Sequence, residues 1–215
     1  MLLKILFYVI FIYMQNICLI IGAGAGVGGN VAKVFANDGY HVYLTRRSDE
    51  SGLKKLIDTI NASGGKASGK LMNAIKDNTI EDLIHEVEKD LGPISVVVYN
   101  LGAQIGNKKL EDLTLKQFDL GFKMGTLGIF RLCKTLFPYM VKRGGGTLIA
   151  TSSTASVRGN RGQHSHAAAM GARRMLCQTL NDEFSIKGIH IIHAIIDGAV
   201  DAPDTLGKML GPEAY

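Results

Sequence analysis

Five glycines fall within eight residues of this chain, directly after a short apolar run at residues 17–21. Residues 30–36 then have a helical pattern, so the stretch predicts a strand that turns straight into a helix. Such a turn brings backbone N–H groups and the positive end of the helix dipole to one place, which suits a pyrophosphate. Two glycine spacings fit this use, Gly24-x-Gly26-x-x-Gly29 and Gly22-x-x-x-Gly26-x-Gly28. The predicted binding residues are Gly22, Gly24, Gly26, Val27 and Gly28. A plain tight turn is the alternative.

Two arginines, Arg46 and Arg47, follow the next predicted strand at residues 41–45. In dinucleotide-binding sheets, an acidic residue at this place holds the ribose 2′-hydroxyl of NAD, whereas arginine accommodates the 2′-phosphate of NADP. No Asp or Glu lies between the strand and Asp49. The pair therefore favours NADP(H) over NAD(H). A solvated charge pair at a strand end is the other interpretation.

Strand and helix patterns alternate along the rest of the chain. The predicted strands cover residues 67–72, 94–99, 147–151 and 189–196, and the predicted helices cover residues 53–62, 79–90, 114–142 and 164–187. Gly121, Gly125 and Gly128 interrupt the third of these helices. The alternation indicates an α/β fold, a doubly wound parallel sheet with helices on both faces, in three layers and one domain at residues 15–215.

The composition restricts the classes of function. Lys and Arg outnumber Asp and Glu by 24 to 19, but the basic residues are scattered as pairs, so no nucleic-acid partner is expected. The six histidines show no metal-ligand spacing with cysteine or carboxylate. Cys18, Cys133 and Cys177 lie far apart in apolar segments. They have the character of reduced core residues in a cytoplasmic protein.

Residues 2–14 form an apolar run broken only by Lys4. The run is short of the ~20 residues that a membrane-spanning helix needs. No pair of small residues marks a signal-peptide cleavage site after it. Three interpretations stay open for this N-terminal extension of residues 1–14: a membrane-associating anchor, an extra element packed on the domain, or a segment missing from the functional protein because translation begins at Met14.

Several separate stretches resemble one family, the short-chain dehydrogenase/reductases. They are Gly22-x-x-x-Gly26-x-Gly28, Tyr99-Asn100-Leu101-Gly102, Ser152-Ser153 and Asp197-Gly198-Ala199-Val200, which occur in the family's order and spacing. The resemblance implies a Rossmann fold and hydride transfer between NAD(P) and a carbonyl or alcohol substrate. It also implies that Asn73 lies at the adenine edge and that Asn100, Gly102 and Gly198 line the cofactor.

The family's catalytic positions are only partly kept. The resemblance implies that Ser153 hydrogen-bonds the substrate oxygen. The family's tyrosine and lysine positions fall on His166 and Met170, and its asparagine position falls on Gly125. A histidine, with an unperturbed pKa near ~6.5, can exchange a proton at neutral pH, whereas methionine cannot hold ribose hydroxyls as lysine does. His166 and Met170 lie four residues apart, on one face of the predicted helix.

Two departures from the family pattern bear on function. Asp197 stands where most members have proline, and the segment around it resembles a branch in which the active-site tyrosine is commonly missing. Family members also usually continue beyond the position of Tyr215 through another helix and strand. The resemblance therefore implies that the C-terminal part is truncated here.

Two hypotheses about function follow. The first is an NADP-dependent oxidoreductase with a non-standard active site, in which Ser153 and His166 are catalytic and Met170 lies at the cofactor. The second is a catalytically inactive NADP(H)-binding protein that acts as a sensor or partner subunit. The family's usual subunit contacts fall on the long predicted helices around residues 118–139 and 167–184, so the resemblance also implies a homo-oligomer.

Overall fold

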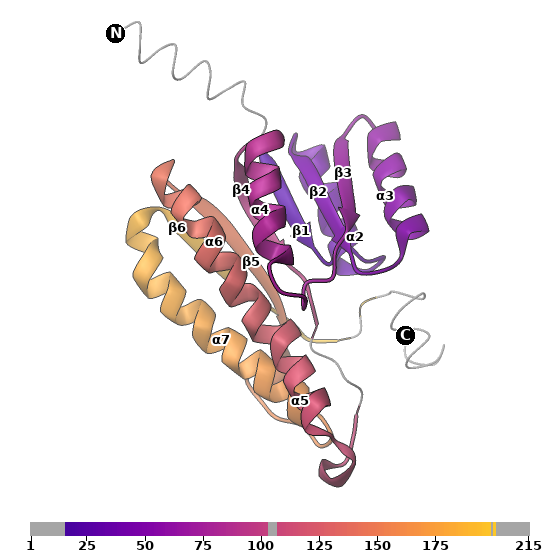
Figure 1. Ribbon diagram of the computed structural model, residues 1–215, viewed down its shortest axis with the longest axis vertical. Coiled ribbons are helices and arrows are strands. Elements are labelled where there is room, and N and C mark those ends of the chain that lie inside the picture. Colours follow the sequence, from indigo (N-terminus) through magenta and orange to yellow (C-terminus); the bar gives the residue numbers. More distant parts are fainter. Residues whose placement is uncertain (1–15, 103–106, 199, 201–215) are drawn as a thin grey trace, which may run out of the picture.

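The computed structural model describes residues 16–102, 107–198 and 200 (Figure 1). Within these residues lies one six-stranded sheet, made of β1 (Ile17–Ile21), β2 (His41–Arg46), β3 (Lys66–Leu71), β4 (Ile94–Tyr99), β5 (Gly146–Ser153) and β6 (Ile189–Ile196). All neighbouring strands are parallel, in the order β3-β2-β1-β4-β5-β6. The order reverses between β1 and β4, as in a doubly wound Rossmann sheet. The predicted fold class is confirmed.

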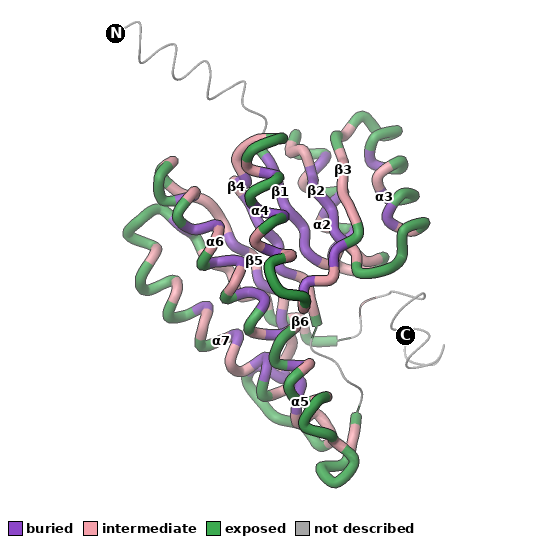
Figure 2. The backbone as a smooth tube through the Cα atoms, in the orientation of Figure 1, coloured by how far each residue is buried: buried purple, intermediate pink, exposed green. Residues whose placement is uncertain are grey.

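The two central strands are apolar on both faces. Every residue of β1 is buried, and in β4 only Ser95 is partly exposed. β-branched residues dominate both strands, which suits a parallel sheet that is covered on both sides. Figure 2 shows this buried centre, with exposed residues along the outer faces of α3 (Glu50–Ala62) and α7 (His164–Phe184).

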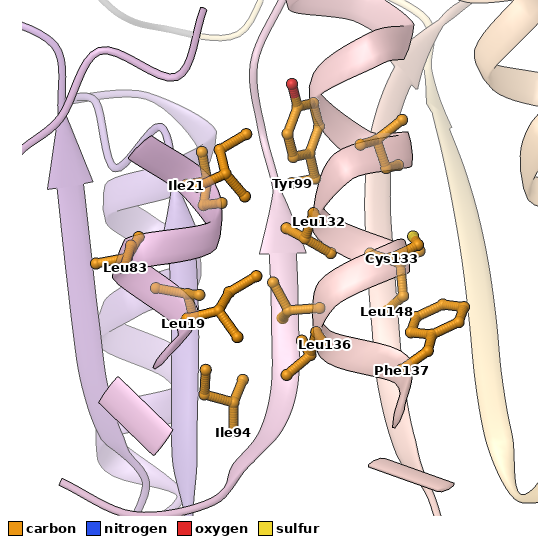
Figure 3. Packing of buried hydrophobic residues seen from close by; sticks show 14 of the residues in the cluster. Leu19, Ile21, Leu83, Ile94, Tyr99, Leu132, Cys133, Leu136, Phe137 and Leu148 are labelled. Atoms are coloured by element: carbon orange, nitrogen blue, oxygen red, sulfur yellow. The ribbon is translucent and has the colours of Figure 1, made fainter. Parts of the chain in front are cut away.

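Helices cover the two faces of the sheet in separate groups. On one face, Ala32 of α2 (Val27–Asn37) and Leu56 of α3 pack against Ile20 of β1. On the other face lie α4 (Thr79–Asp90), α6 (Gly128–Lys142) and α7. Figure 3 shows how α4 and α6 contact the sheet, where Leu83 of α4 and Leu132 of α6 lie close to the strands. Cys18, Cys133 and Cys177 are buried free thiols in these cores, as predicted.

The segment predicted as one interrupted helix is continuous but changes its winding. It consists of α5 (Leu115–Phe122), a π-helical turn η2 (Lys123–Leu127) and then α6. Thr114 begins it with a capping box, because its hydroxyl accepts from the backbone N–H of Gln117 and the Gln117 side chain accepts from the backbone N–H of Thr114. A π-turn inserts one residue and leaves backbone groups without their usual helical partners, and such turns are frequent at functional sites.

Several predicted bounds were wrong by a few residues. Helix α2 begins at Val27 and not at residue 30, because its first turn holds Gly28 and Gly29, whose low helix propensity hides the start. Strand β5 continues through Ser153, so Ser152 and Ser153 belong to the strand and do not follow it. The helix predicted to reach residue 187 ends at Phe184, and a 3₁₀ turn, η4 (Ser185–Lys187), completes it.

Among the described residues, no helix has the length and apolar character needed to cross a bilayer. The predictions for residues 1–14 and for the chain beyond residue 200 lie outside the described residues.

Candidate active site and cofactor site

The carboxyl ends of the parallel strands bring most of the predicted site residues to one edge of the sheet. β1 ends before Gly22, β2 ends at Arg46, β4 ends before Asn100 and β5 ends at Ser153. In open α/β sheets, ligands bind outside this edge where the strand order reverses. Here the reversal lies between β1 and β4, so the glycine turn and Asn100 stand on its two sides.

The glycine turn is packed too closely for a side chain at Gly22, Gly28 and Gly29. Gly22 has a φ of +94°, which favours glycine. A Cβ atom on Gly28 would lie 2.2 Å from the carbonyl oxygen of Gly22 and 2.8 Å from Nδ2 of Asn100. The helix α2 starts immediately after Gly26, and within the described residues no side chain caps it. This open helix end, reached by a turn of only glycine and alanine, fits a pyrophosphate.

Gly24 and Gly102 are under weaker constraint. Among the described residues, no atom would lie within 4 Å of a Cβ added at either position, so packing does not explain glycine there. Gly198 has the same open space but a φ of +133°, so its backbone conformation favours glycine. Free space at Gly24 and Gly102 leaves room for a ligand to approach the backbone.

Arg46 is turned toward the glycine turn. Its Nε donates to the carbonyl oxygen of Ala23 at 2.6 Å, and its Nη1 pairs with the carboxylate of Asp49. The N–H of Gly52 and the Arg46 guanidinium hold the pKa of Asp49 below its usual value. Arg47 is exposed. Asn73 lies two residues after the end of β3, the strand beside β2. Met72, the residue before it, donates its N–H to the Arg46 carbonyl oxygen at 2.7 Å.

Asn100 links the two sides of the reversal point. Its Nδ2 donates to the carbonyl oxygen of Gly22 at 2.9 Å, and its Oδ1 accepts from Oγ1 of Thr151 at 2.8 Å. One amide side chain thereby ties the glycine turn to the end of β5. This places Asn100 between the turn and the strand that carries Ser153.

Ser153 and His166 meet. Oγ of Ser153 lies 3.0 Å from Nε2 of His166, the third residue of α7. Only 8% of His166 is exposed. Met170, one turn later, is 1% exposed and packs with Ala155 and Ala169, and the Ser152 hydroxyl donates to its Sδ at 3.7 Å. A serine–histidine contact of this kind can orient a carbonyl oxygen and move a proton.

Gly125, at the family's asparagine position, lies inside the π-turn. Two long-range groups bind the carbonyl oxygens of this turn: the Tyr99 hydroxyl donates to Met124 at 2.7 Å, and Nε of Arg173 donates to Gly125 at 2.6 Å. Burial raises the pKa of Tyr99 and lowers that of Arg173. The Tyr99 hydroxyl comes this close because Gly128 has no side chain, since a Cβ atom there would lie 2.1 Å from it.

The sequence analysis assigned no role to the side chains of Tyr99 and Arg173. Arg173 and Arg174 form one of the basic pairs scattered along the sequence. The spacing of Arg173 on the helix was the available signal, because it shares a face with His166, Met170 and Cys177, all of which are buried.

The family model described as short chain dehydrogenase matches residues 16–208. The 3-oxoacyl-(acyl-carrier-protein) reductase of Thermotoga maritima is 28% identical over 194 residues, which cover 88% of this chain and 76% of the relative.

Two solved structures give the same picture of the fold. A 7α-hydroxysteroid dehydrogenase, complexed with NADH and 7-oxo glycochenodeoxycholic acid, has a TM-score of 0.82 and 27% identity, covering 93% of this chain and 77% of that one. A gluconate 5-dehydrogenase of Burkholderia cenocepacia J2315, in complex with NADP and tartrate, has a TM-score of 0.80 and 22% identity, covering 89% and 74%.

Proposed function

Since this chain belongs to the short-chain dehydrogenase family of NAD(P)-dependent oxidoreductases, we propose that it is an NADP(H)-dependent enzyme that interconverts a carbonyl and an alcohol. The observation that carries this proposal is the 3.0 Å contact between Ser153 and His166, beside the carboxyl edge of the sheet. This pair takes the place of the family's serine and tyrosine.

The residues at the glycine turn fit a nicotinamide dinucleotide. Gly22 and Gly28 allow close approach of the backbone to the dinucleotide. The start of α2 at Val27 offers its N–H groups to the pyrophosphate. Arg46 and Arg47 bind the 2′-phosphate. Asn73 borders the adenine. The wall of the cofactor site is lined by Asn100, Gly102 and Gly198, and Met170 contributes only an apolar contact.

When bound, the dinucleotide supplies or accepts the hydride at the substrate carbon. In the direction of reduction, the Ser153 hydroxyl hydrogen-bonds the carbonyl oxygen and fixes its position. His166, hydrogen-bonded to the same serine, delivers the proton to that oxygen as the alcohol forms. In the direction of oxidation, His166 removes the proton.

A second candidate function is binding of NADP(H) without catalysis, as a sensor or partner subunit. The surroundings of Met170 favour it: this side chain is 1% exposed among apolar neighbours, where the family has a lysine. The glycine turn and arginines would then be kept for binding alone.

The test compares His166→Phe with wild type and with His164→Phe as a matched control, which removes a histidine from the same helix. We expect His166→Phe to lose reduction of a panel of aldehydes and ketones by NADPH at least ~10²-fold, the usual contribution of a general acid. Its NADPH affinity, followed by nicotinamide fluorescence, stays unchanged. His164→Phe should match wild type in both measurements.

The other results separate the candidates. If wild type binds NADPH but reduces no carbonyl, the non-catalytic function stands. If His166→Phe keeps its turnover, another group donates the proton.

A further inference from the structure

Arg173 is a buried cation in the middle of α7. Arg173 is 1% exposed, and its guanidinium donates to three backbone carbonyls. Nε binds Gly125 at 2.6 Å, Nη2 binds Leu101 at 2.7 Å and Nη1 binds Thr151. The guanidinium carbon also lies 5.1 Å from the centre of the Tyr99 ring.

The three carbonyls belong to segments that are far apart in the sequence but border the same site. Leu101 follows Asn100 on the wall of the cofactor site. Thr151 lies on β5, two residues before Ser153. Gly125 lies in the π-turn, at the position of the family's asparagine. One planar group with donors in fixed directions therefore joins the end of β4, the end of β5 and the π-turn.

Burial of this charge is costly unless its donors are satisfied. In the described part of the chain, no carboxylate forms an ion pair with Arg173, so the carbonyl dipoles compensate the charge. The arginine stays protonated, although burial lowers its pKa. Removal of the side chain would leave three carbonyls without this donor, and a buried carbonyl without a partner is costly. The segments would then shift to find other partners.

We propose that Arg173 is the positioning residue of this site: it fixes the cofactor wall at Leu101, the strand that carries Ser153 and the π-turn relative to one another. Its position one turn after Met170 explains how the site can keep its form without a lysine there. The arginine does not touch substrate, because its donors are engaged by the backbone. Its effect on cofactor binding rests on the proposed function, but its effect on the three segments does not.

The first measurement needs no cofactor. Hydrogen exchange by mass spectrometry compares wild type with Arg173→Met and Arg173→Lys, with Arg174→Met as the matched control from the same helix. We expect Arg173→Met to exchange faster in peptides that contain Leu101, Gly125 and Thr151, while peptides of α3 and β2 stay protected. Arg173→Lys, which keeps the charge, should show a smaller increase, and Arg174→Met should match wild type.

The second measurement is NADPH affinity at a temperature where every variant is folded. We expect Kd to rise roughly tenfold or more in Arg173→Met, because a small displacement of the wall has large effects on binding, with partial rescue in Arg173→Lys. If Arg173→Met does not yield folded protein, Arg173→Lys decides both measurements.

Two results would overturn the proposal. One is unchanged exchange in the three segments, and the other is a uniform increase over the whole molecule with NADPH affinity intact, which would mean general stabilisation only. If wild type itself binds neither NADPH nor NADH, the proposed function fails, and the exchange measurement still decides the role of Arg173.

Discussion

The two arginines at the end of β2 differ in their surroundings. Arg46 binds the carbonyl of Ala23 and the carboxylate of Asp49, whereas Arg47 is exposed. We therefore expect Arg46→Met to weaken binding of both NADPH and NADH, because the glycine turn loses a contact, and to weaken NADPH more, because the 2′-phosphate also loses a partner. Arg47→Met should raise the Kd of NADPH several-fold and leave NADH unchanged, since an exposed charge on a phosphate contributes about 1 kcal/mol.

Fluorescence titration with both cofactors checks this difference. Lys89→Met, an exposed cation at the end of α4, controls for the change in net charge. Equal losses of NADPH and NADH affinity in Arg47→Met would show that this arginine does not distinguish the 2′-phosphate.

Residue spacing in the sequence predicted part of this site. The prediction that His166 and Met170 share a helix face is confirmed, since both are buried on α7. The family's spacing predicted that Ser153 and His166 belong to one site, and their side chains are in contact. Their catalytic roles stay predictions. Arg173 could not be found in this way, because its three partners come from distant segments and are backbone atoms, which carry no signal in the residue types.

Between helices, one ion pair offers a test at the level of elements. Arg131 of α6 binds Glu81 of α4 through two hydrogen bonds, from Nε at 2.8 Å and from Nη2 at 2.6 Å. The Arg131 side chain holds the pKa of Glu81 below the ordinary value of 4.5. The folded state is therefore stabilised above that pH, and the contribution is lost as pH falls through the lowered pKa.

We expect Glu81→Gln to reduce the free energy of unfolding by about 1 kcal/mol at pH 7, where the pair is charged. The difference from wild type should shrink as the pH drops below 4.5. Urea unfolding at several pH values measures both. Glu183→Gln, from the exposed pair with Lys187, is the control and should change stability by less than about 0.5 kcal/mol. A difference that grows in acid would contradict this assignment.

The elements themselves were mostly predictable from periodicity. The bounds of β4, α4 and β6 were right, because β-branched runs and helical spacing are local signals. The π-turn at Lys123–Leu127 was not predicted. The sequence shows Gly125 in this turn, but the groups that bind the turn, the Tyr99 hydroxyl and the Arg173 guanidinium, come from β4 and α7. A change of helical winding that depends on such tertiary contacts has no signature in a local window.

At the scale of the whole molecule, apolar side chains remain exposed beside α5, α6 and α7. Phe122, Leu127 and Phe130 are 39%, 42% and 46% exposed, and with Leu176 they border a hollow of about 280 Å³. Exposed apolar surface of this kind marks an interaction site. We expect a homo-oligomer that buries it.

Light scattering after size-exclusion chromatography tests this expectation. Phe130→Glu should lower the molar mass to that of one chain, because a charge in an apolar interface is costly. Ile186→Glu, a change at an 88% exposed apolar residue elsewhere, should keep the wild-type mass. A monomeric wild type would contradict the expected assembly.

The order of the strands also has a consequence for synthesis of the chain on the ribosome. β1 is buried between β2, which follows it closely, and β4, which is made only after α3, β3 and α4. One edge of a wholly apolar strand thus stays open while most of the first half of the chain emerges. An open apolar edge is a template for wrong pairing. The open edge of β1 is therefore closed only when residues 94–99 appear, and that of β4 only when β5 follows.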